Sequence, residues 1–77
     1  MKIEKITVAC ELPVIRTVGR VYSTELVVGQ LHTMIIRGVQ REQIGYVESI
    51  DSDGTFVLKN MFGTHTFDVK NIKFLCV

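Results

Sequence analysis

The sequence predicts a small all-β domain folded as a partly open barrel of five to six short antiparallel strands. Apolar and polar residues alternate with a period of two along most of the chain, and turn residues interrupt this alternation at short intervals. The 77 residues are too few for an immunoglobulin-type sandwich, which needs about 100. A bent barrel suits this length because closure removes exposed strand edges. We therefore expect residues 1–77 to form one domain.

The N-terminal part is expected to add a strand region over residues 1–22. Residues 3–12 place apolar side chains on one face and polar ones on the other, which is typical of a half-buried strand. Pro13 then ends or bends this strand because proline lacks the backbone N–H. The sequence STEL at 23–26 is expected to open a short helical turn or to form a loop.

The rest of the chain alternates between strands and tight turns. Residues 30–37 are apolar on both faces, which suits a central strand. Aspartate, serine, glycine and asparagine mark the reversals, because their side chains or backbone favour turn conformations. The further expected strands are 43–50, 55–60, 64–69 and 72–77, joined by turns at 51–54, 61–63 and 70–71.

Composition limits the function classes. Nine basic residues against eight acidic ones give a net charge of +1, which argues against strong sequence-independent binding of nucleic acid. Hydrophobic residues make up 47% of the chain, although a chain of this length buries only about 60% of its unfolded surface. Part of the apolar surface is therefore expected in an interface, and we predict a homo-oligomer.

The two cysteines indicate a reducing compartment. Cys10 and Cys76 both have apolar neighbours in the sequence, so we expect two buried thiols; a single bridge between the terminal strands is the alternative. The N-terminus does not resemble a signal peptide, and no apolar run approaches the roughly 18 residues of a membrane span. We expect a cytoplasmic protein without a membrane partner.

Two glycines seven residues apart are the most distinctive local pattern. The stretch MIIRGVQREQIGYVESI holds an apolar strand, Gly38, a charged loop, Gly45 and a second alternating strand. It resembles a KOW motif, the strand–loop–strand element of small SH3-like barrels. Arg41 takes a basic loop position of that motif, and Val47 and Ile50 take its later apolar positions.

The resemblance covers about residues 26–75 and implies both a fold and a function. The segment FDVKNIKFL is similar to the closing strands of such barrels. The family often has a further glycine where this chain has Glu42, and its loop is usually richer in lysine than VQREQ. KOW domains are common in ribosomal proteins and transcription factors, so the resemblance implies a module that contacts RNA or protein through its loops.

The candidate binding residues begin in this loop. Arg37 and Arg41 can contact phosphate or carboxylate groups. Gly38 and Gly45 can let the backbone approach a partner, and the Tyr46 ring can stack on a base or a side chain. The alternative is that both glycines are ordinary turn or bulge residues beside a solvated loop tip.

A second candidate surface is the turn at 61–63. Met61 and Phe62 form an apolar pair at a position where turns are usually polar. Such a pair either marks an interface or caps one end of the barrel.

The sequence does not support a metal site, a cofactor or catalysis. A calcium loop starting at Asp51 needs glycine at its sixth position and glutamate at its twelfth, but Phe56 and Phe62 stand there. His32, His65 and the cysteines lack the spacing of zinc ligands. No nucleophile elbow or phosphate loop occurs.

These observations predict a non-enzymatic binding module, an oligomeric adaptor or inhibitor that docks a protein partner. One alternative is an RNA-binding barrel that uses the 38–45 loop with Arg37, Arg41 and Tyr46. Another is an oligomer that holds a small ligand between its subunits. A small barrel without fused domains is also typical of phage or mobile-element proteins that block a host factor.

Overall fold

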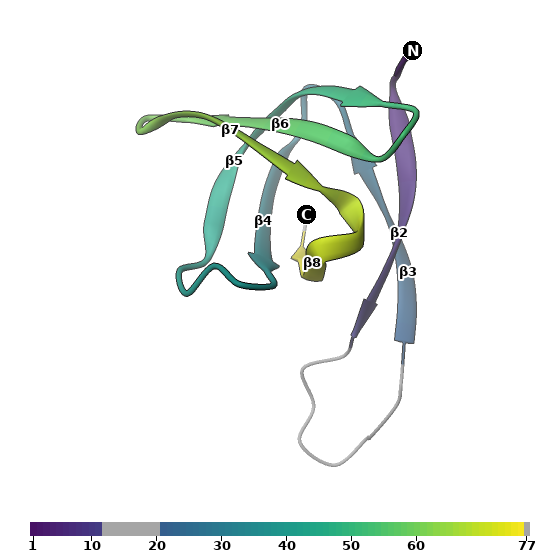
Figure 1. The fold of residues 1–77 in the computed structure, drawn as a ribbon, viewed down its shortest axis with the longest axis vertical. Coiled ribbons are helices and arrows are strands. Elements are labelled where there is room, and N and C mark those ends of the chain that lie inside the picture. Colours follow the sequence, from purple (N-terminus) through teal and green to yellow (C-terminus); the bar gives the residue numbers. More distant parts are fainter. Residues whose placement is uncertain (12–20, 77) are drawn as a thin grey trace.

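The fold is a small, antiparallel, all-β domain, as the sequence predicts (Figure 1). The structure is a computed structural model that describes residues 1–11 and 21–76. In that part of the chain one short 3-10 turn accompanies the strands. The elements are β1 (Lys2–Ile3), β2 (Lys5–Glu11), β3 (Val21–Val27), β4 (Leu31–Ile36), β5 (Gln43–Asp51), β6 (Thr55–Asn60), β7 (Gly63–Asp68), η1 (Val69–Asn71) and β8 (Ile72–Cys76).

The strands form two antiparallel sheets that do not close into a complete barrel. The larger sheet has the order β7-β6-β5-β4-β8, and β1 pairs with β5 beside this path. The second sheet is the β2–β3 ribbon, which runs past one side of the curled sheet (Figure 1) and lies against β8. The expected partly open architecture is therefore confirmed. The described residues hold more strands than the five to six expected, partly because a bend at Glu4 separates β1 from β2.

The core lies between the curled sheet and the β2–β3 ribbon. Each strand turns alternate side chains inward, and burying one large aliphatic or aromatic side chain contributes about 1.5–3 kcal/mol. The Phe67 ring of β7 leans on the buried Phe56 ring, with 5.9 Å between ring centroids. The buried apolar side chains are Val8, Cys10, Leu26, Met34, Ile36, Val47, Ile50, Phe56, Leu58, Ile72 and Leu75.

One expectation about local structure is wrong. Residues 23–26 are neither a helical turn nor a loop but part of β3, which pairs with β2 from Lys5↔Val27 to Glu11↔Val21. This long-range pairing and the burial of Leu26 outweigh the local capping preference of serine and threonine. Expectations that concern residues 12–20, including the bend at Pro13, lie outside the described residues.

The two cysteines also differ from expectation, because only one of them is buried. Cys10 lies in the core, whereas Cys76 is exposed. Cys76 is opposite Thr33 in the β4–β8 pairing, and it is the neighbouring Leu75 that points inward beside Met34. The expectation of two buried thiols is therefore wrong for Cys76, since alternation along β8 turns it to the outer face.

The turn at 51–54 forms the expected hairpin between β5 and β6. The Asp53 carboxylate accepts a hydrogen bond from the Thr55 amide at 2.9 Å, and the Gly54 amide donates to the Asp51 carbonyl at 2.9 Å. The expected reversal near residues 70–71 is η1, where the Asp68 carboxylate accepts from the Lys70 amide.

The two spaced glycines have different structural roles. Gly38 follows β4 with φ +84°, a conformation in which a Cβ atom causes strain. Gly45 has ordinary strand geometry but lies where the backbone of β6, its paired neighbour, comes close to β5. A Cβ atom on Gly45 would lie 2.6 Å from the Lys59 carbonyl oxygen and 3.0 Å from Leu58 Cγ. Gly45 therefore permits the close approach of two strands of this chain.

We predict that Gly45→Ala destabilises the domain, because the added methyl group must displace the backbone of β6. The expected loss is about 1–3 kcal/mol in the free energy of unfolding, as for other overpacked sites. Urea unfolding followed by circular dichroism measures it. Thr66→Ala, at an exposed strand position, is the control and should stay within about 0.5 kcal/mol of wild type. Equal effects of the two changes would contradict this role of Gly45.

Among the described side chains, His32 is the buried polar one of the core. Its Nε2 atom accepts a hydrogen bond from the Val27 amide at 3.3 Å, which requires the neutral ring with its proton on Nδ1. Burial lowers the pKa of His32 below its ordinary value of 6.5. This effect outweighs hydrogen bonding by the Cys76 backbone, which raises the pKa. The folded protein therefore binds a proton at His32 less readily than the unfolded chain does.

This difference predicts that acidification destabilises the fold. Just below pH 6.5 the unfolded chain protonates His32 while the folded chain does not, so the free energy of unfolding decreases as pH decreases. His32 makes its full contribution to the free energy of unfolding well above pH 6.5. This contribution is lost as the pH falls towards the lower pKa of His32 in the folded state. Urea unfolding between about pH 7.5 and 5.5 tests this, a range that lies above most carboxylate titrations. His32→Gln should flatten the slope and His65→Gln should keep it; an unchanged slope in His32→Gln would refute the assignment.

Candidate functional site

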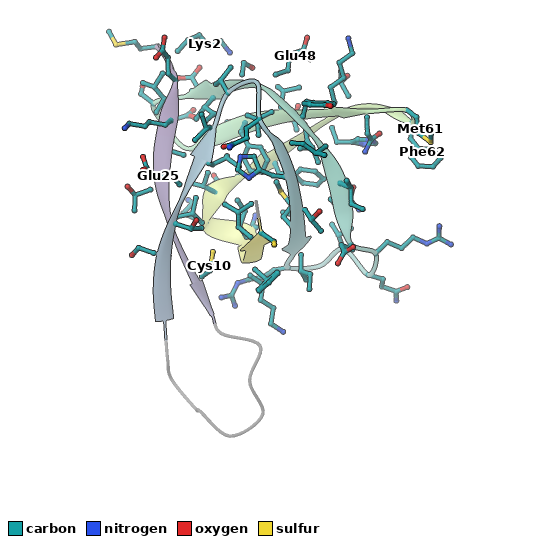
Figure 2. The ribbon with its side chains drawn as sticks, turned by 180° about the vertical axis from the view of Figure 1, so that it is seen from behind. Lys2, Cys10, Glu25, Glu48, Met61 and Phe62 are labelled. Atoms are coloured by element: carbon teal, nitrogen blue, oxygen red, sulfur yellow. The ribbon has the colours of Figure 1, made fainter. Side chains whose placement is uncertain are left out.

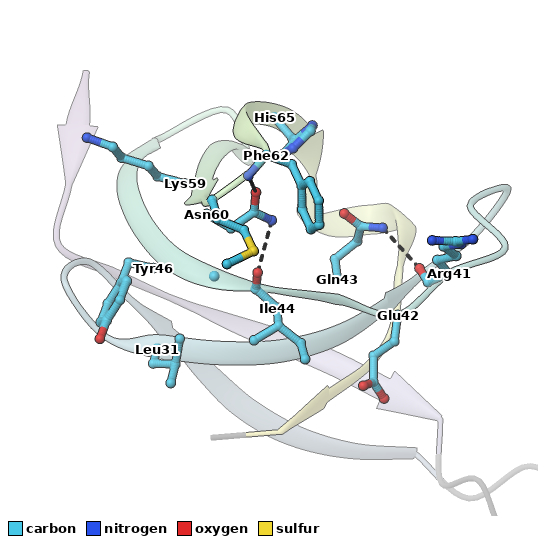
Figure 3. A pocket seen from close by; sticks show the side chains of 12 residues that line it. Leu31, Arg41, Glu42, Gln43, Ile44, Tyr46, Lys59, Asn60, Phe62 and His65 are labelled. Atoms are coloured by element: carbon cyan, nitrogen blue, oxygen red, sulfur yellow. Dashed lines mark hydrogen bonds between the residues drawn. The ribbon is translucent and has the colours of Figure 1, made fainter.

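An apolar groove lies on the outer face of the sheet, below the overhanging β6–β7 hairpin (Figure 3). Its volume is about 620 Å³. The floor consists of Leu31 from β4 with Ile44 and Tyr46 from β5, and each of these side chains is about half exposed. Leu31 pairs directly with Tyr46 across the strands. Alternation accounts for this floor, because these residues point away from the core when their neighbours point into it.

The wall of the groove is the tip of the β6–β7 hairpin. Met61 and Phe62 occupy the two-residue turn between Asn60 and Gly63, which pair with each other. Figure 2 shows their side chains at the free end of the hairpin, away from the barrel. Met61 is 90% exposed and Phe62 is 83% exposed, so both line the groove without filling it. They do not cap the barrel end.

Asn60 connects this tip to the floor. Its side-chain amide donates a hydrogen bond to the Ile44 carbonyl at 3.0 Å, and its side-chain oxygen accepts one from the Phe62 amide at 2.9 Å (Figure 3). The same side chain therefore shapes the turn and ties it to β5. This connection holds the hairpin over the groove.

Charged side chains lie at the two ends of the groove. Lys59 is at the end that contains Tyr46, whereas Arg41 and Glu42 are at the opposite end (Figure 3). The Gln43 side chain donates to the Arg41 carbonyl at 3.0 Å and so braces the loop at that end. Within the described residues, neither Glu42 nor Lys59 forms an ion pair.

The structure brings together most of the binding residues proposed from the sequence. Arg41, Gly45, Tyr46, Met61 and Phe62 all line the groove, although Gly45 does so as part of its buried frame. The loop candidates and the turn candidates, which are far apart in the sequence, thus belong to one surface.

Two of the proposed residues do not line the groove. Arg37 and Gly38 lie at the start of the loop, and the Arg37 amide donates to the Asn71 carbonyl at 2.7 Å, beside η1. Gly38 serves the turn that follows β4.

Sequence reasoning did not find the floor residues Leu31 and Ile44 or the bridging residue Asn60. The signal for Leu31 was present, because residues 30–37 are apolar on both faces. That pattern predicts a central strand. β4 is central in the sheet, but its outer face is open to solvent. No sequence signal distinguishes Asn60 from other turn asparagines.

The groove offers an apolar surface with charged ends. In the described part of the chain, no three histidine, cysteine, aspartate or glutamate side chains gather in a group that can hold a metal ion. The same residues include no helix with the length and apolar character needed to cross a bilayer. No family model, curated protein or solved structure matches the chain.

We predict that Asn60→Ala releases the hairpin tip, because both hydrogen bonds of the side chain are lost. Each such bond contributes about 0.5–1.5 kcal/mol. Amide hydrogen exchange should show faster exchange at Phe62. Asn60→Asp is the matched control, since its carboxylate still accepts from the Phe62 amide but does not donate to the Ile44 carbonyl. Protection of Phe62 should therefore survive in Asn60→Asp; equal loss in both variants would contradict the assignment.

Proposed function

We propose that the protein is a non-enzymatic module that binds a protein through the outer face of its sheet and acts as an adaptor or inhibitor. The observation that supports this is a cluster of exposed apolar side chains on one face, here called the outer-face patch. Most of them line the groove, and Ile35 extends the patch along β4. The patch consists of Leu31, Ile35, Ile44, Tyr46, Met61 and Phe62.

The chemistry of the patch favours a protein partner. Tyrosine, phenylalanine and methionine are enriched in protein interfaces, whose apolar centre is surrounded by a polar rim. Here the apolar floor and tip lie between Lys59 at one end and Glu42 with Arg41 at the other. The thiols of Cys10 and Cys76, which are not in disulfides, support a reducing cytoplasm as the location.

RNA binding through the 38–45 loop is the alternative that the KOW resemblance supports. The charges of the groove favour it less, because Glu42 stands beside Arg41 and repels phosphate. Arg37 does not line the groove.

A small ligand is a further alternative. The volume of the groove is within the range of about 300–1,000 Å³ for ligand pockets. Its floor residues nevertheless stay about half exposed, whereas pockets enclose most of a ligand's surface.

Site-specific photo-crosslinking in the native cell tests the proposal. Tyr46→p-benzoylphenylalanine places a reactive ketone on the groove floor, and the same replacement of Glu25 places it on the β2–β3 ribbon, on the side away from the hairpin tip (Figure 2). We expect protein adducts from position 46 but not from position 25. Ile44→Asp should abolish the adducts, because it puts a charge in the apolar floor.

Two outcomes would refute protein docking at this face. One is adduct formation that is equal at positions 46 and 25 or insensitive to Ile44→Asp. The other is an adduct at position 46 that nuclease removes, which would favour the RNA-binding alternative.

A further inference from the structure

We infer that the outer side of β7 binds an extended segment of a partner protein, which adds a strand to the larger sheet through backbone hydrogen bonds. This side of β7, which faces away from β6, is here called the β7 edge. It is made of backbone groups, whereas the groove floor is made of apolar side chains. The inference goes beyond the proposed function and does not depend on docking in the groove.

The β7 edge is one end of the larger sheet. The strand order is β7-β6-β5-β4-β8, so β7 has a neighbour on one side only (Figure 1). Within residues 1–11 and 21–76, β7 pairs with β6 alone. The strand at the other end of the sheet, β8, lies against the β2–β3 ribbon. The described part of the chain therefore covers one end of this sheet and leaves the other open.

The hydrogen bonds of the β6–β7 hairpin determine which backbone groups face β6. The Val69 amide donates to the Gly54 carbonyl at 2.9 Å, one step beyond the last pair of the ladder. In an antiparallel ladder, only every second residue of a strand bonds to the neighbouring strand. Counting back from Val69, those residues are Phe67 and His65.

The residues in between, Thr64 and Thr66, direct their N–H and C=O groups towards the β7 edge. None of these backbone groups has a hydrogen bond within the described residues. Both side chains are exposed. Unpaired backbone groups along an exposed strand are a template for pairing with another chain.

The sequence of β7 lacks the features that usually prevent such pairing. Proteins protect sheet edges with proline, with lysine or with bulges. The strand GTHTFD contains neither proline nor lysine, and its register against β6 continues without a bulge. Its acidic residue, Asp68, lies at its end. Threonine suits a pleated strand, so Thr64 and Thr66 favour an added neighbour.

The pattern of unpaired groups specifies an extended peptide as the occupant. The donors and acceptors recur at every second residue, roughly 6.8 Å apart at about 3.4 Å per residue. An extended backbone has groups with the same repeat, whereas a helix uses its backbone groups internally. In recognition of this kind, main-chain hydrogen bonds supply affinity and alternate side chains supply specificity.

The side chains of β7 indicate which residues the segment carries. The His65 and Phe67 rings stack on one face of the strand, with 6.3 Å between ring centroids, and both are half-buried. A paired segment places every second side chain beside these rings. Aromatic and β-branched residues pack well against aromatic neighbours across strands, so we expect them at those positions.

Amide hydrogen exchange on the purified chain tests whether the β7 edge is free. After correction for intrinsic rates, we expect Thr64 and Thr66 to exchange at least about tenfold faster than His65 and Phe67, because only the latter are bonded to β6. Equal protection of all these amides would overturn the inference.

A displayed library of random peptides, long enough to form a strand, tests the pairing itself. Peptides are selected on the wild-type chain. Thr66→Pro removes an N–H from the β7 edge and keeps the bonds to β6, since proline is tolerated on edge strands. Thr66→Val keeps the N–H and is the matched control. We expect the selected peptides to bind Thr66→Pro at least about tenfold more weakly and Thr66→Val like wild type.

A second measurement does not require any variant to fold. On wild type, a selected peptide should slow amide exchange at Thr64 and Thr66, because their N–H groups become hydrogen-bonded. Unchanged exchange at both positions would overturn the pairing. Circular dichroism establishes which variants are folded.

The outcomes separate this inference from docking in the groove. Peptides that lose binding to Thr66→Pro but bind Ile44→Asp normally support pairing at the β7 edge, whatever occupies the groove. Peptides with the opposite preference would overturn that pairing and support the groove. A library without binders would also overturn it. A wild-type dimer that Thr66→Pro abolishes would assign the edge to a second copy and refute a separate partner.

Discussion

The close approach of the paired strands β5 and β6 at Gly45 is the constraint on which the rest of the structure depends. β5 pairs with β4 in its first half and with β6 in its second half, and the change of partner falls around Gly45 and Tyr46. Without a side chain at Gly45, the carbonyl of Lys59 can approach the β5 backbone. This approach lies where β5 changes its pairing partner, beside the groove that the β6–β7 hairpin overhangs. Gly45 thus belongs both to the buried frame of the sheet and to the lining of the groove.

The same strands build both the interior and the exposed patch. Met34 and Val47 point inward and are buried, while their neighbours Ile35 and Tyr46 point outward and stay exposed. A strand with period two has only two faces, so outward apolar residues must meet solvent or another surface. β4 and β5 keep apolar residues on both faces, although the domain covers only one of them. The apolar outer face is therefore the surface on which the proposed docking rests, whereas the inner face is covered by the domain itself.

Much of the fold was accessible from the sequence because alternation and turn chemistry are local signals. The hairpin at 51–54, the central strand near 30–37 and the reversal before β8 all depend on such signals. The strand β3 was not accessible from the sequence, because the pairing that stabilises it joins residues far apart in the chain. In the site, Met61 and Phe62 were recognisable as apolar residues at a turn. Their position beside the groove floor depends on the hydrogen bond from the Asn60 side chain to the Ile44 carbonyl, which spans 16 residues.

The proposed docking on the outer face adds to the stability of the fold. A 77-residue chain buries only about 60% of its unfolded surface, so its core leaves a small margin of stability. A partner that binds only the folded state stabilises it by about 2.7 kcal/mol at 100 times the dissociation constant. This equals the contribution of about one fully buried core side chain. An apolar outer face lowers the solubility of an isolated domain, whereas a partner that covers this face adds stability. Under the proposed function, a partner in the groove therefore compensates for the small size of the core.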